Sequence, residues 1–395
     1  MKTNILVAGL VLATVGTVLI YPTLRGNATA PLPPQQIAPL AAQRVEVVFV
    51  LDTTGSMGGL IDAAKEKIWS IASTLAQARQ APEISIGLVA YRDRGDAYVT
   101  QVVDLNRDLD SMYAKLMDFA ADGGGDGPEA VNEALDAAIH RMSWSQDPST
   151  YKVVFLVGDA PPHMDYANDV QYPQVVAAAA AKGIVVNTIQ CGTLHDTVAP
   201  WQHIANLGGG RYFTVEQAGS AVAIATPFDS QIATLSAALD STRFYYGTAD
   251  ERSAMAAKVA ATARLNEEAS VAARARRGAF NVSESGAGNF LGGRELVADV
   301  ASGRVDIAAL PPAALPAAVA ALPAEEQRTF LAETAQKREA LQRQIATLAA
   351  ERDAYLEEQI EARGGAAASL DQQIYDAVRE QAAPLGVDYD GGPKF

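Results

Sequence analysis

VVFVLDTTGSM, residues 47–57, joins an apolar run to a loop rich in side-chain oxygen atoms. The continuous apolar run Val47–Leu51 is typical of a strand buried on both faces of a sheet. Asp52, Thr54 and Ser56 follow at alternate positions, so a carboxylate and two hydroxyls can converge on one cation. Oxygen ligands of this kind suit Mg²⁺ or Mn²⁺. The segment therefore predicts a site for one divalent ion at the end of a strand.

The same residue types are ordinary turn formers, so this segment alone is equally consistent with a strand-ending turn that binds no metal. A second apolar strand pattern, KVVFLVGDAPPH over residues 152–163, ends at Asp159. In open α/β sheets, ligands bind at the edge formed by the carboxyl ends of the strands. Because Asp52 and Asp159 each end such a strand, the two together favour the metal site.

The spacing of Asp52, Thr54 and Ser56 fits the pattern D-x-[ST]-x-S. In this it resembles the metal-ion-dependent adhesion site (MIDAS) of the von Willebrand factor A (VWA) domain family. The resemblance covers roughly residues 44–240, just over half of the chain.

Two later segments extend the resemblance. The run GGGDGPEA, residues 123–130, places Asp126 in a glycine-rich loop before a helix, and Asp159 follows the later strand. Both lie where family members supply further ligands. Most members carry a threonine in the first of these loops and T-D-G after the strand. The aspartate and the G-D-A of this chain are instead similar to the GGGDxPE subgroup.

The resemblance also implies how a metal ion would be held. The hydroxyls would contact the ion directly, and the carboxylates directly or through water. One coordination position would stay open for an acidic group of a protein partner, which is compatible with the several waters that Mg²⁺ usually keeps. The implied metal-binding residues are Asp52, Thr54, Ser56, Asp126 and Asp159.

Strand and helix patterns alternate through the first part of the chain. Strand-like apolar runs occupy residues 45–51, 84–91, 152–158, 183–191 and 211–215, and helical patterns occupy residues 60–78, 128–144, 170–183 and 200–209. Residues 97–105 follow a strand without an intervening helix, so we expect an antiparallel edge strand there. The alternation predicts an α/β fold, a doubly wound and mostly parallel sheet of the VWA/Rossmann-like type, followed by an α-helical C-terminal region.

Three residues near the predicted site carry weaker signals, and the single cysteine lies at the end of another strand-like run. His163 could bind the ion and would then favour a transition metal, but a solvated loop histidine is the simpler interpretation. Arg92 and Asp93 close the second strand, where they could orient a ligand by hydrogen bonds or form a structural ion pair. Cys191 is the only cysteine, so no intrachain disulfide is expected, and we interpret it as a small apolar strand residue.

Residues 1–30 have the pattern of an export signal, in which Lys2 precedes a long apolar run and Ala28-Thr29-Ala30 offers a cleavage site. The apolar run, residues 5–21, is at the lower limit for crossing a bilayer, so an uncleaved membrane anchor is the alternative. Residues 31–43 contain PLPPQQIAPL and predict a stiff Pro-rich tether. An alanine-rich, exported chain suggests the bacterial periplasm or cell envelope.

The composition changes near residue 240, and 395 residues suffice for two domains. Residues 241–322 indicate a helical and irregular connecting region, in which the glycine- and serine-rich residues 281–293 are expected to form a loop. Residues 323–395 begin with a proline and about forty residues without a helix breaker, which predicts a long helix. Its short heptad seam leaves a coiled-coil dimer open, but a hairpin with a C-terminal helix is favoured.

The net charge of −15 argues against nucleic acid as a partner. A metal-dependent hydrolase would need a general base or a second metal, for which Asp93 and His163 are the nearby candidates. The chain has no G-x-S-x-G, H-E-x-x-H or phosphate-binding G-x-x-x-x-G-K-[ST] pattern, so we assign no catalytic residue. The favoured function is an exported, metal-dependent protein-binding module for adhesion or assembly. The alternative is a structural adaptor that acts through its helical C-terminal region.

Overall fold

The computed structural model describes residues 43–75, 78, 81–125, 127–215, 224–362 and 369–389. The predicted export signal and all but the last residue of the predicted tether lie outside these ranges. Asp126, one of the five predicted metal-binding residues, lies outside them as well.

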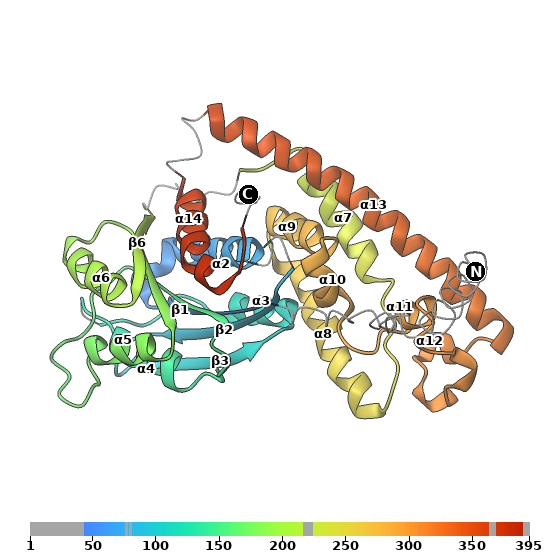
Figure 1. The fold of residues 1–395 in the computed structure, drawn as a ribbon, viewed down its shortest axis with the longest axis horizontal. Helices are drawn as coiled ribbons and strands as arrows, with labels where there is room; N and C mark the ends of the chain where they lie inside the picture. Colours follow the sequence, from blue (N-terminus) through green and yellow to red (C-terminus); the bar gives the residue numbers. More distant parts are fainter. Residues whose placement is uncertain are drawn as a thin grey trace, which may run out of the picture. The chain divides into compact units, whose positions relative to one another are not determined.

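A six-stranded sheet forms the centre of the first part of the chain (Figure 1). Its strands are β1 Arg44–Asp52, β2 Glu83–Tyr91, β3 Thr100–Asn106, β4 Tyr151–Gly158, β5 Ile184–Cys191 and β6 Gly209–Val215. The strand order is β3-β2-β1-β4-β5-β6, and every neighbouring pair is parallel except β2 and β3. The predicted doubly wound, mostly parallel sheet with an antiparallel edge strand is therefore confirmed.

The register of the central strands positions the predicted site. β1 lies between β2 and β4, with Asp52 opposite Tyr91 and Leu51 opposite Val157. The β1 residues from Val47 to Asp52 are at most 1% exposed, as expected for a strand covered on both faces. Asp52 and Asp159 consequently leave neighbouring strands at the same edge of the sheet.

Helices cover both faces of the sheet. On one face lie α2 Ile61–Leu75 and α3 Leu109–Asp118, and on the other lie α4 Val131–His140, α5 Tyr172–Ala181 and α6 His195–Leu207. A short 3₁₀ segment, Gly55–Gly59, links the end of β1 to α2. Each face has its own hydrophobic core, so the strands are buried between two helical layers.

The described part of the chain has eight α-helices after β6, which confirms the predicted helical C-terminal region. They are α7 Asp229–Asp240, α8 Ala249–Glu268, α9 Val271–Asn281, α10 Glu284–Leu291, α11 Leu296–Ala301, α12 Ala317–Ala320, α13 Ala324–Ala362 and α14 Leu370–Ala382. Short 3₁₀ segments at Ile307–Ala309 and Pro312–Ala314 separate α11 from α12, and a third, Ala383–Leu385, follows α14.

The prediction of a loop over residues 281–293 is wrong, because most of this segment forms α10. The Ser283 side chain caps the helix by accepting a hydrogen bond from the backbone N–H of Gly286 at 3.1 Å. A Cβ atom on Gly286 would lie 1.9 Å from the carbonyl oxygen of Phe280. Glycine is needed here because two helices approach closely. In the sequence, a glycine required by close packing cannot be distinguished from a glycine of a flexible loop.

The long helix α13 buries a seam that repeats every seven residues. Its members include Leu331, Arg338, Ile345 and Arg352. They pack on α7, α9 and α11, and the two arginines form buried ion pairs, Arg338 with Glu295 at 2.8 Å and Arg352 with Asp229 at 2.9 Å. The seam considered for a coiled-coil dimer is thus occupied by helices of the same chain.

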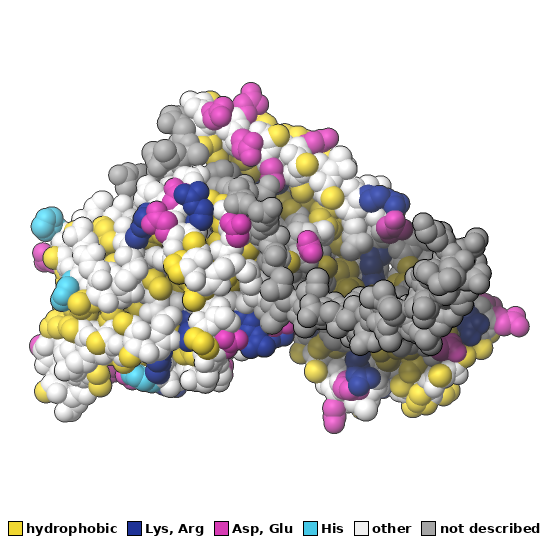
Figure 2. Space-filling view, viewed as in Figure 1, with side chains coloured by type: hydrophobic (Ala, Val, Ile, Leu, Met, Phe, Trp, Pro, Cys, Tyr) yellow, Lys and Arg dark blue, Asp and Glu magenta, His cyan; other side chains and the backbone are white. Residues whose placement is uncertain are grey.

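The outward face of the second half of α13 is acidic (Figure 2). Its exposed acidic side chains are Glu351, Glu357, Glu358 and Glu361. Arg352, the only basic residue between positions 344 and 362, is buried. This face therefore contributes to the net charge of −15.

The last helix, α14, returns to the sheet. The sequence favoured a hairpin between α13 and α14, but α14 packs instead on α2 and β6 (Figure 1). Lys67 of α2 pairs with Asp371 at 2.7 Å, and the Gln381 amide donates to Asn187 of β5 at 2.9 Å. The apolar side of α14 joins the same core as α2 and α3, because this side of the sheet has room for a further helix.

Residues beyond α14 extend this contact. The Tyr389 hydroxyl donates to the carbonyl oxygen of Leu75, at the end of α2, at 2.9 Å. The Tyr375 hydroxyl in turn donates to the carbonyl oxygen of Tyr389 at 2.5 Å. Both tyrosines are at most 4% exposed, so residues 369–389 belong to the hydrophobic core of the sheet.

We predict that Ile374→Ala in α14 lowers the free energy of unfolding by about 2–5 kcal/mol, the usual cost of a large-to-alanine change in a core. Ile374 is 2% exposed within the core of the sheet. Urea unfolding followed by circular dichroism measures the change. Val259→Ala, at a side chain that is 43% exposed on α8, is the matched control and should stay within about 0.5 kcal/mol. Equal effects of the two substitutions would contradict the placement of α14 in this core.

Candidate metal centre

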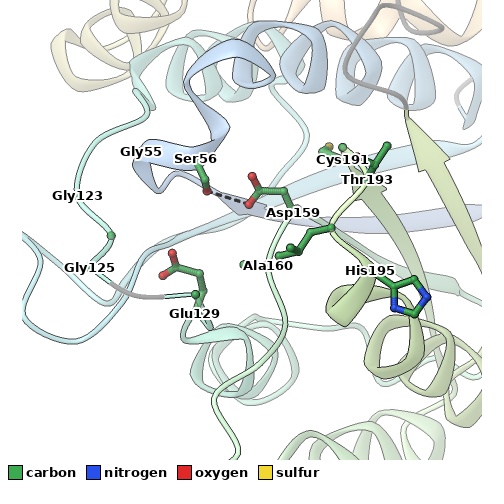
Figure 3. A pocket seen from close by; sticks show the side chains of 14 residues that line it. Gly55, Ser56, Gly123, Gly125, Glu129, Asp159, Ala160, Cys191, Thr193 and His195 are labelled. Atoms are coloured by element: carbon green, nitrogen blue, oxygen red, sulfur yellow. Dashed lines mark hydrogen bonds between the residues drawn. The ribbon is translucent and has the colours of Figure 1, made fainter.

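The structure brings four of the five predicted metal-binding residues together. The Thr54 hydroxyl donates to Asp52 Oδ1 at 2.7 Å and lies 3.0 Å from the Ser56 hydroxyl. The Ser56 hydroxyl donates to Asp159 Oδ1 at 2.9 Å, the contact drawn in Figure 3. Side chains from the ends of β1 and β4 thus form one connected group of oxygen atoms. Asp126 lies outside the described residues, and the ligand role of all five stays a prediction.

Local backbone contacts hold the loop after β1 in place. Asp52 Oδ1 also accepts the backbone N–H of Thr54 at 2.9 Å, which turns the chain back toward the carboxylate. A Cβ atom on Gly158 would lie 2.7 Å from Asp52 Cβ, so a side chain there would push Asp52 away from β4. The backbone N–H of Gly55 donates to the carbonyl oxygen of Gly123 at 3.0 Å. The glycine-rich loop is thereby fixed against the loop after β1.

Glu129 is a further acidic residue of this site, and the sequence patterns did not indicate it. Its side chain is 3% exposed and lines the same cavity as Ser56 and Asp159. Glu129 Oε1 and Thr54 Cβ lie on the same side of Gly124, at 3.3 Å and 3.4 Å from a Cβ atom built on that glycine. The residue belongs to the GGGDGPEA run, but an acidic residue just before a helix is common because the helix dipole favours it. Its signal in the sequence was therefore ambiguous.

Burial raises the pKa of three carboxylates at the site, those of Asp52, Glu129 and Asp159. Burial raises the pKa of Asp52 to about 7, against hydrogen bonds from Thr54 that lower it, and the neighbouring Asp159 raises it further. Burial, followed by the charge of Asp52, raises the pKa of Glu129 to about 9. Burial likewise raises the pKa of Asp159. A cation placed among the three would favour their charged forms.

Two oxygen atoms support the fit of a metal ion. Asp52 Oδ2 and Glu129 Oε2 are buried, and neither has a hydrogen-bond partner among the described residues. Such atoms are costly unless something neutralises them. The available donors are hydroxyl and carboxylate oxygens, which suit Mg²⁺ or Mn²⁺. In the described ranges, no three His, Cys, Asp or Glu side chains are arranged to hold a metal ion by themselves.

The site opens into a cavity of about 680 Å³. The glycine-rich loop and Glu129 form one side of it, and residues 191–195, from the last residue of β5 onward, form the other (Figure 3). Leu194 is 48% exposed on that second side. Cys191 also lines the cavity but is only 2% exposed, and burial raises the pKa of its thiol, so the expected apolar strand role holds and a reactive thiol is disfavoured.

His163 is buried, which corrects the interpretation of a solvated loop histidine. Its Nδ1 lies 2.8 Å from Asp165, its Nε2 lies 3.5 Å from Asp93, and its ring stacks on Tyr166 with centroids 3.9 Å apart. The backbone N–H of His163 donates to the carbonyl oxygen of Glu129 at 3.1 Å. The histidine therefore anchors the loop after β4, and it does not line the cavity of the candidate site.

Arg92 and Asp93 connect loops around the site. Arg92 Nε donates to the carbonyl oxygen of Thr53 at 3.1 Å, and another guanidinium nitrogen donates to that of Ala120 at 3.0 Å. Asp93 accepts the Tyr166 hydroxyl at 2.9 Å. The sequence left open whether these residues orient a ligand or form a structural ion pair, and the contacts fit a structural role. Arg92 mainly contacts backbone carbonyls, and it also forms an ion pair with Asp122 at 3.6 Å.

A family model described as von Willebrand factor A domain matches residues 46–225. The match begins within β1 and includes the five strands that follow it. It therefore contains every residue of the candidate metal centre.

Known proteins are similar in sequence to part of this chain. Alpha-protein kinase vwkA of Dictyostelium discoideum is 30% identical over 124 residues, which are 31% of this chain and 19% of that protein. The von Willebrand factor A domain-containing protein 7 of Rattus norvegicus is 37% identical over 114 residues, 29% of this chain and 12% of that protein. The chain thus matches less than a fifth of the length of either relative.

Solved structures with a similar fold include the SpRpn10 VWA domain, at 15% identity and a TM-score of 0.35, covering 45% of this chain and 90% of that one. Another is proximal thread matrix protein 1 from the mussel byssus with a zinc-occupied MIDAS motif, at 15% identity and a TM-score of 0.35, covering 45% and 43%. The family match and the sheet topology carry the assignment without them. The family match and the sheet topology together support a von Willebrand factor A domain at residues 46–225 of this chain.

Proposed function

We propose that this protein is an exported, divalent-metal-dependent protein-binding module that acts in adhesion or assembly. VWA domains typically mediate interactions between proteins, and the family match supports such a domain at residues 46–225. The observation that most supports metal dependence is the hydrogen-bonded group of Asp52, Thr54, Ser56 and Asp159 at one edge of the sheet.

The proposed site is a MIDAS of the GGGDxPE type that holds one Mg²⁺ or Mn²⁺ ion. Thr54 and Ser56 would offer hydroxyl oxygens, and Asp52, Asp159 and Asp126 would offer carboxylates, directly or through water. The ion would supply a positive charge at the floor of the cavity. A partner protein would bind there through an acidic side chain that reaches the ion, with the apolar Leu194 at the rim of the same cavity.

A binding role is better supported than catalysis. A metal-dependent hydrolase needs a base or a second metal beside the first. The two bases considered from the sequence, Asp93 and His163, do not line the cavity and are held by Tyr166 and Asp165. The kinase among the relatives is matched over 19% of its length, so its activity supports no proposal for this chain.

The helical region supports the alternative function, a structural adaptor. Helices α7 to α13 enclose two hydrophobic clusters of their own, and α13 exposes an acidic face. Truncation after residue 240 would not separate the two functions, because it also removes α14 from the core of the sheet. An internal deletion of residues 224–362 fails for the same reason, because Leu265 of α8 and Phe280 of α9 also belong to this core. Charge reversal of the exposed Glu357 and Glu358 of α13 leaves the core intact and is the appropriate variant.

Export is proposed from the sequence of residues 1–30, with cleavage after Ala30 and the bacterial periplasm or cell envelope as destination. Retention as a membrane anchor through residues 5–21 is the alternative. In the part of the chain that the structure describes, no helix combines the length and the apolar character needed to cross a bilayer.

Calorimetry of the full chain should detect uptake of one Mn²⁺ or Mg²⁺ ion, and Asp52→Ala should abolish it because a buried ligand oxygen is lost. Protein partners captured from an envelope extract in Mg²⁺ should be released by EDTA. Asp62→Ala is the matched control, since its side chain is 91% exposed on α2. Absence of metal uptake by the unaltered protein would contradict the proposal, as would partners that remain bound in excess EDTA.

The stability of the metal-free protein should fall as pH rises from 5 to 9. The pKa values of Asp52 and Glu129, about 7 and about 9, lie above their ordinary values of 3.8 and 4.5, so unfolding releases protons in this range. The stabilisation that comes from the raised pKa values of Asp52 and Glu129 is fully present below about pH 4. It is lost as pH rises through the folded-state pKa values of these two residues. Differential scanning calorimetry in EDTA should show a falling Tm, and Mg²⁺ should reduce the fall.

Asp52→Asn should flatten the part of this profile below about pH 7, because the amide does not titrate. Asp62→Asn should leave the profile unchanged. A Tm that is constant or rises between pH 5 and 9 in EDTA would refute this prediction.

Expression in a Gram-negative host should yield a protein whose N-terminus is Pro31, as measured by mass spectrometry of the periplasmic fraction. Ala30→Trp should block processing, because signal cleavage requires a small residue at this position. A chain that is recovered in the membrane fraction with residues 5–21 intact would favour the anchor instead.

A further inference from the structure

We propose that Glu129 is itself a ligand of the metal ion and fills, from within the chain, a coordination position that a partner carboxylate would otherwise take. This inference rests on the proposed metal centre. It adds a residue to the predicted ligand set and assigns a specific role to it.

The backbone holds Glu129 firmly beside the site. Its N–H donates to the carbonyl oxygen of Pro161 at 2.9 Å, and its own carbonyl accepts the N–H of His163 at 3.1 Å. These bonds form a short parallel bridge between Glu129 and Pro162, which ties the start of α4 to the loop after β4. Figure 3 shows the carboxylate directed into the cavity on the side of Ser56.

The carboxylate has a buried oxygen that nothing in the described residues satisfies. Glu129 Oε2 is buried without a hydrogen-bond partner, and so is Asp52 Oδ2 on a different loop. The Thr54 side chain contacts Asp52 directly, and its Cβ atom and Glu129 Oε1 both pack against Gly124. A divalent ion bound beside Thr54 would neutralise both oxygens, whereas an ion held by the predicted residues alone would leave Glu129 uncompensated.

Glu129 does not act as a helix cap. A capping carboxylate would accept backbone N–H groups in the first turn of α4. Ala130 occupies the N-cap position of α4, and no side chain makes a capping bond there. The closest atom to a Cβ built on Gly124 is Glu129 Oε1, at 3.3 Å, and the next is Thr54 Cβ at 3.4 Å. The side chain is therefore directed toward the glycine-rich loop and Thr54.

The charges at the site indicate how Glu129 would affect the binding of a partner. Asp52, Asp159 and Glu129 carry three negative charges when ionised, against two positive charges on the ion. Within the described part of the chain, no lysine or arginine lines the cavity. A further carboxylate would increase the negative excess in a partly buried site, at a cost that grows as water is excluded. A partner's acidic group must therefore displace Glu129 from the ion.

With Asp126 acting through water, the five oxygen-bearing side chains Asp52, Thr54, Ser56, Glu129 and Asp159 would leave about one position of a six-coordinate ion for that water. Removing the Glu129 carboxylate would open a second. The same change would weaken binding of the ion and strengthen binding of an external carboxylate. These opposite effects distinguish a ligand that fills a position from a residue that only supports the fold.

The test is Mn²⁺ binding to the full-length protein, measured by calorimetry and by water-proton relaxation per bound ion. Glu129→Gln should lower Mn²⁺ affinity by roughly ten-fold or more, at least the loss that follows removal of an outer-shell partner. It should also raise the relaxation, because water replaces the carboxylate. Glu129→Asp keeps the charge but is shorter by one methylene group, so it should behave like Glu129→Gln.

Asp122→Asn is the matched control, directly before the glycine-rich loop with a side chain that is 82% exposed, and it should match the unaltered protein. Acetate serves as the external carboxylate. It should lower the relaxation of Mn²⁺ bound to Glu129→Gln at concentrations that leave the unaltered protein unchanged. Circular dichroism verifies that each variant is folded.

The outcomes separate the two proposals. If the unaltered protein takes up no Mn²⁺, both the proposed metal centre and this inference are overturned. If it binds Mn²⁺ with the same affinity and relaxation as Glu129→Gln, only the role of Glu129 is overturned. If Glu129→Asp matches the unaltered protein while Glu129→Gln differs, Glu129 acts through space by its charge, and direct ligation is rejected.

Discussion

The burial of the Asp52 carboxylate at the end of the central strand β1 is the constraint around which the candidate site is built. Asp52 is fully buried, and one of its oxygens has no hydrogen-bond partner among the described residues. The neighbouring strand accommodates it only because Gly158 has no side chain to occupy the same space. A charge in this position must be neutralised by a proton or a cation, and the hydroxyls of Thr54 and Ser56 are arranged to share a cation.

The sheet and most of the candidate site could be predicted because their signals are local. A continuous apolar run identifies each parallel strand, and parallel strands bring their carboxyl ends to one edge. Asp52 and Asp159 follow such runs directly, so their proximity followed from the fold class. Glu129 lies at the start of a helix, where an acidic residue is expected for a different physical reason. Only the packing of its loop against the loop after β4 reveals its direction.

The helical region was less predictable because its partners are distant in sequence. Periodicity identifies α13 as a long helix but does not say whether its seam faces another chain or its own. The buried pairs of Arg338 with Glu295 and of Arg352 with Asp229 answer this, and neither pair is visible in a heptad pattern. For α10 the same limit applies, since Gly286 is required by the carbonyl of Phe280.

The return of α14 to the sheet has a consequence for how the protein reaches its native state. The ribosome makes residues 369–389 long after the strands that they cover, so a nascent chain exposes part of the core next to α2 until they emerge. Because α14 contacts helices and strands that are far away in the sequence, this contact raises the contact order, which slows folding. The last stage of synthesis therefore controls when the domain that contains the candidate site becomes fully enclosed.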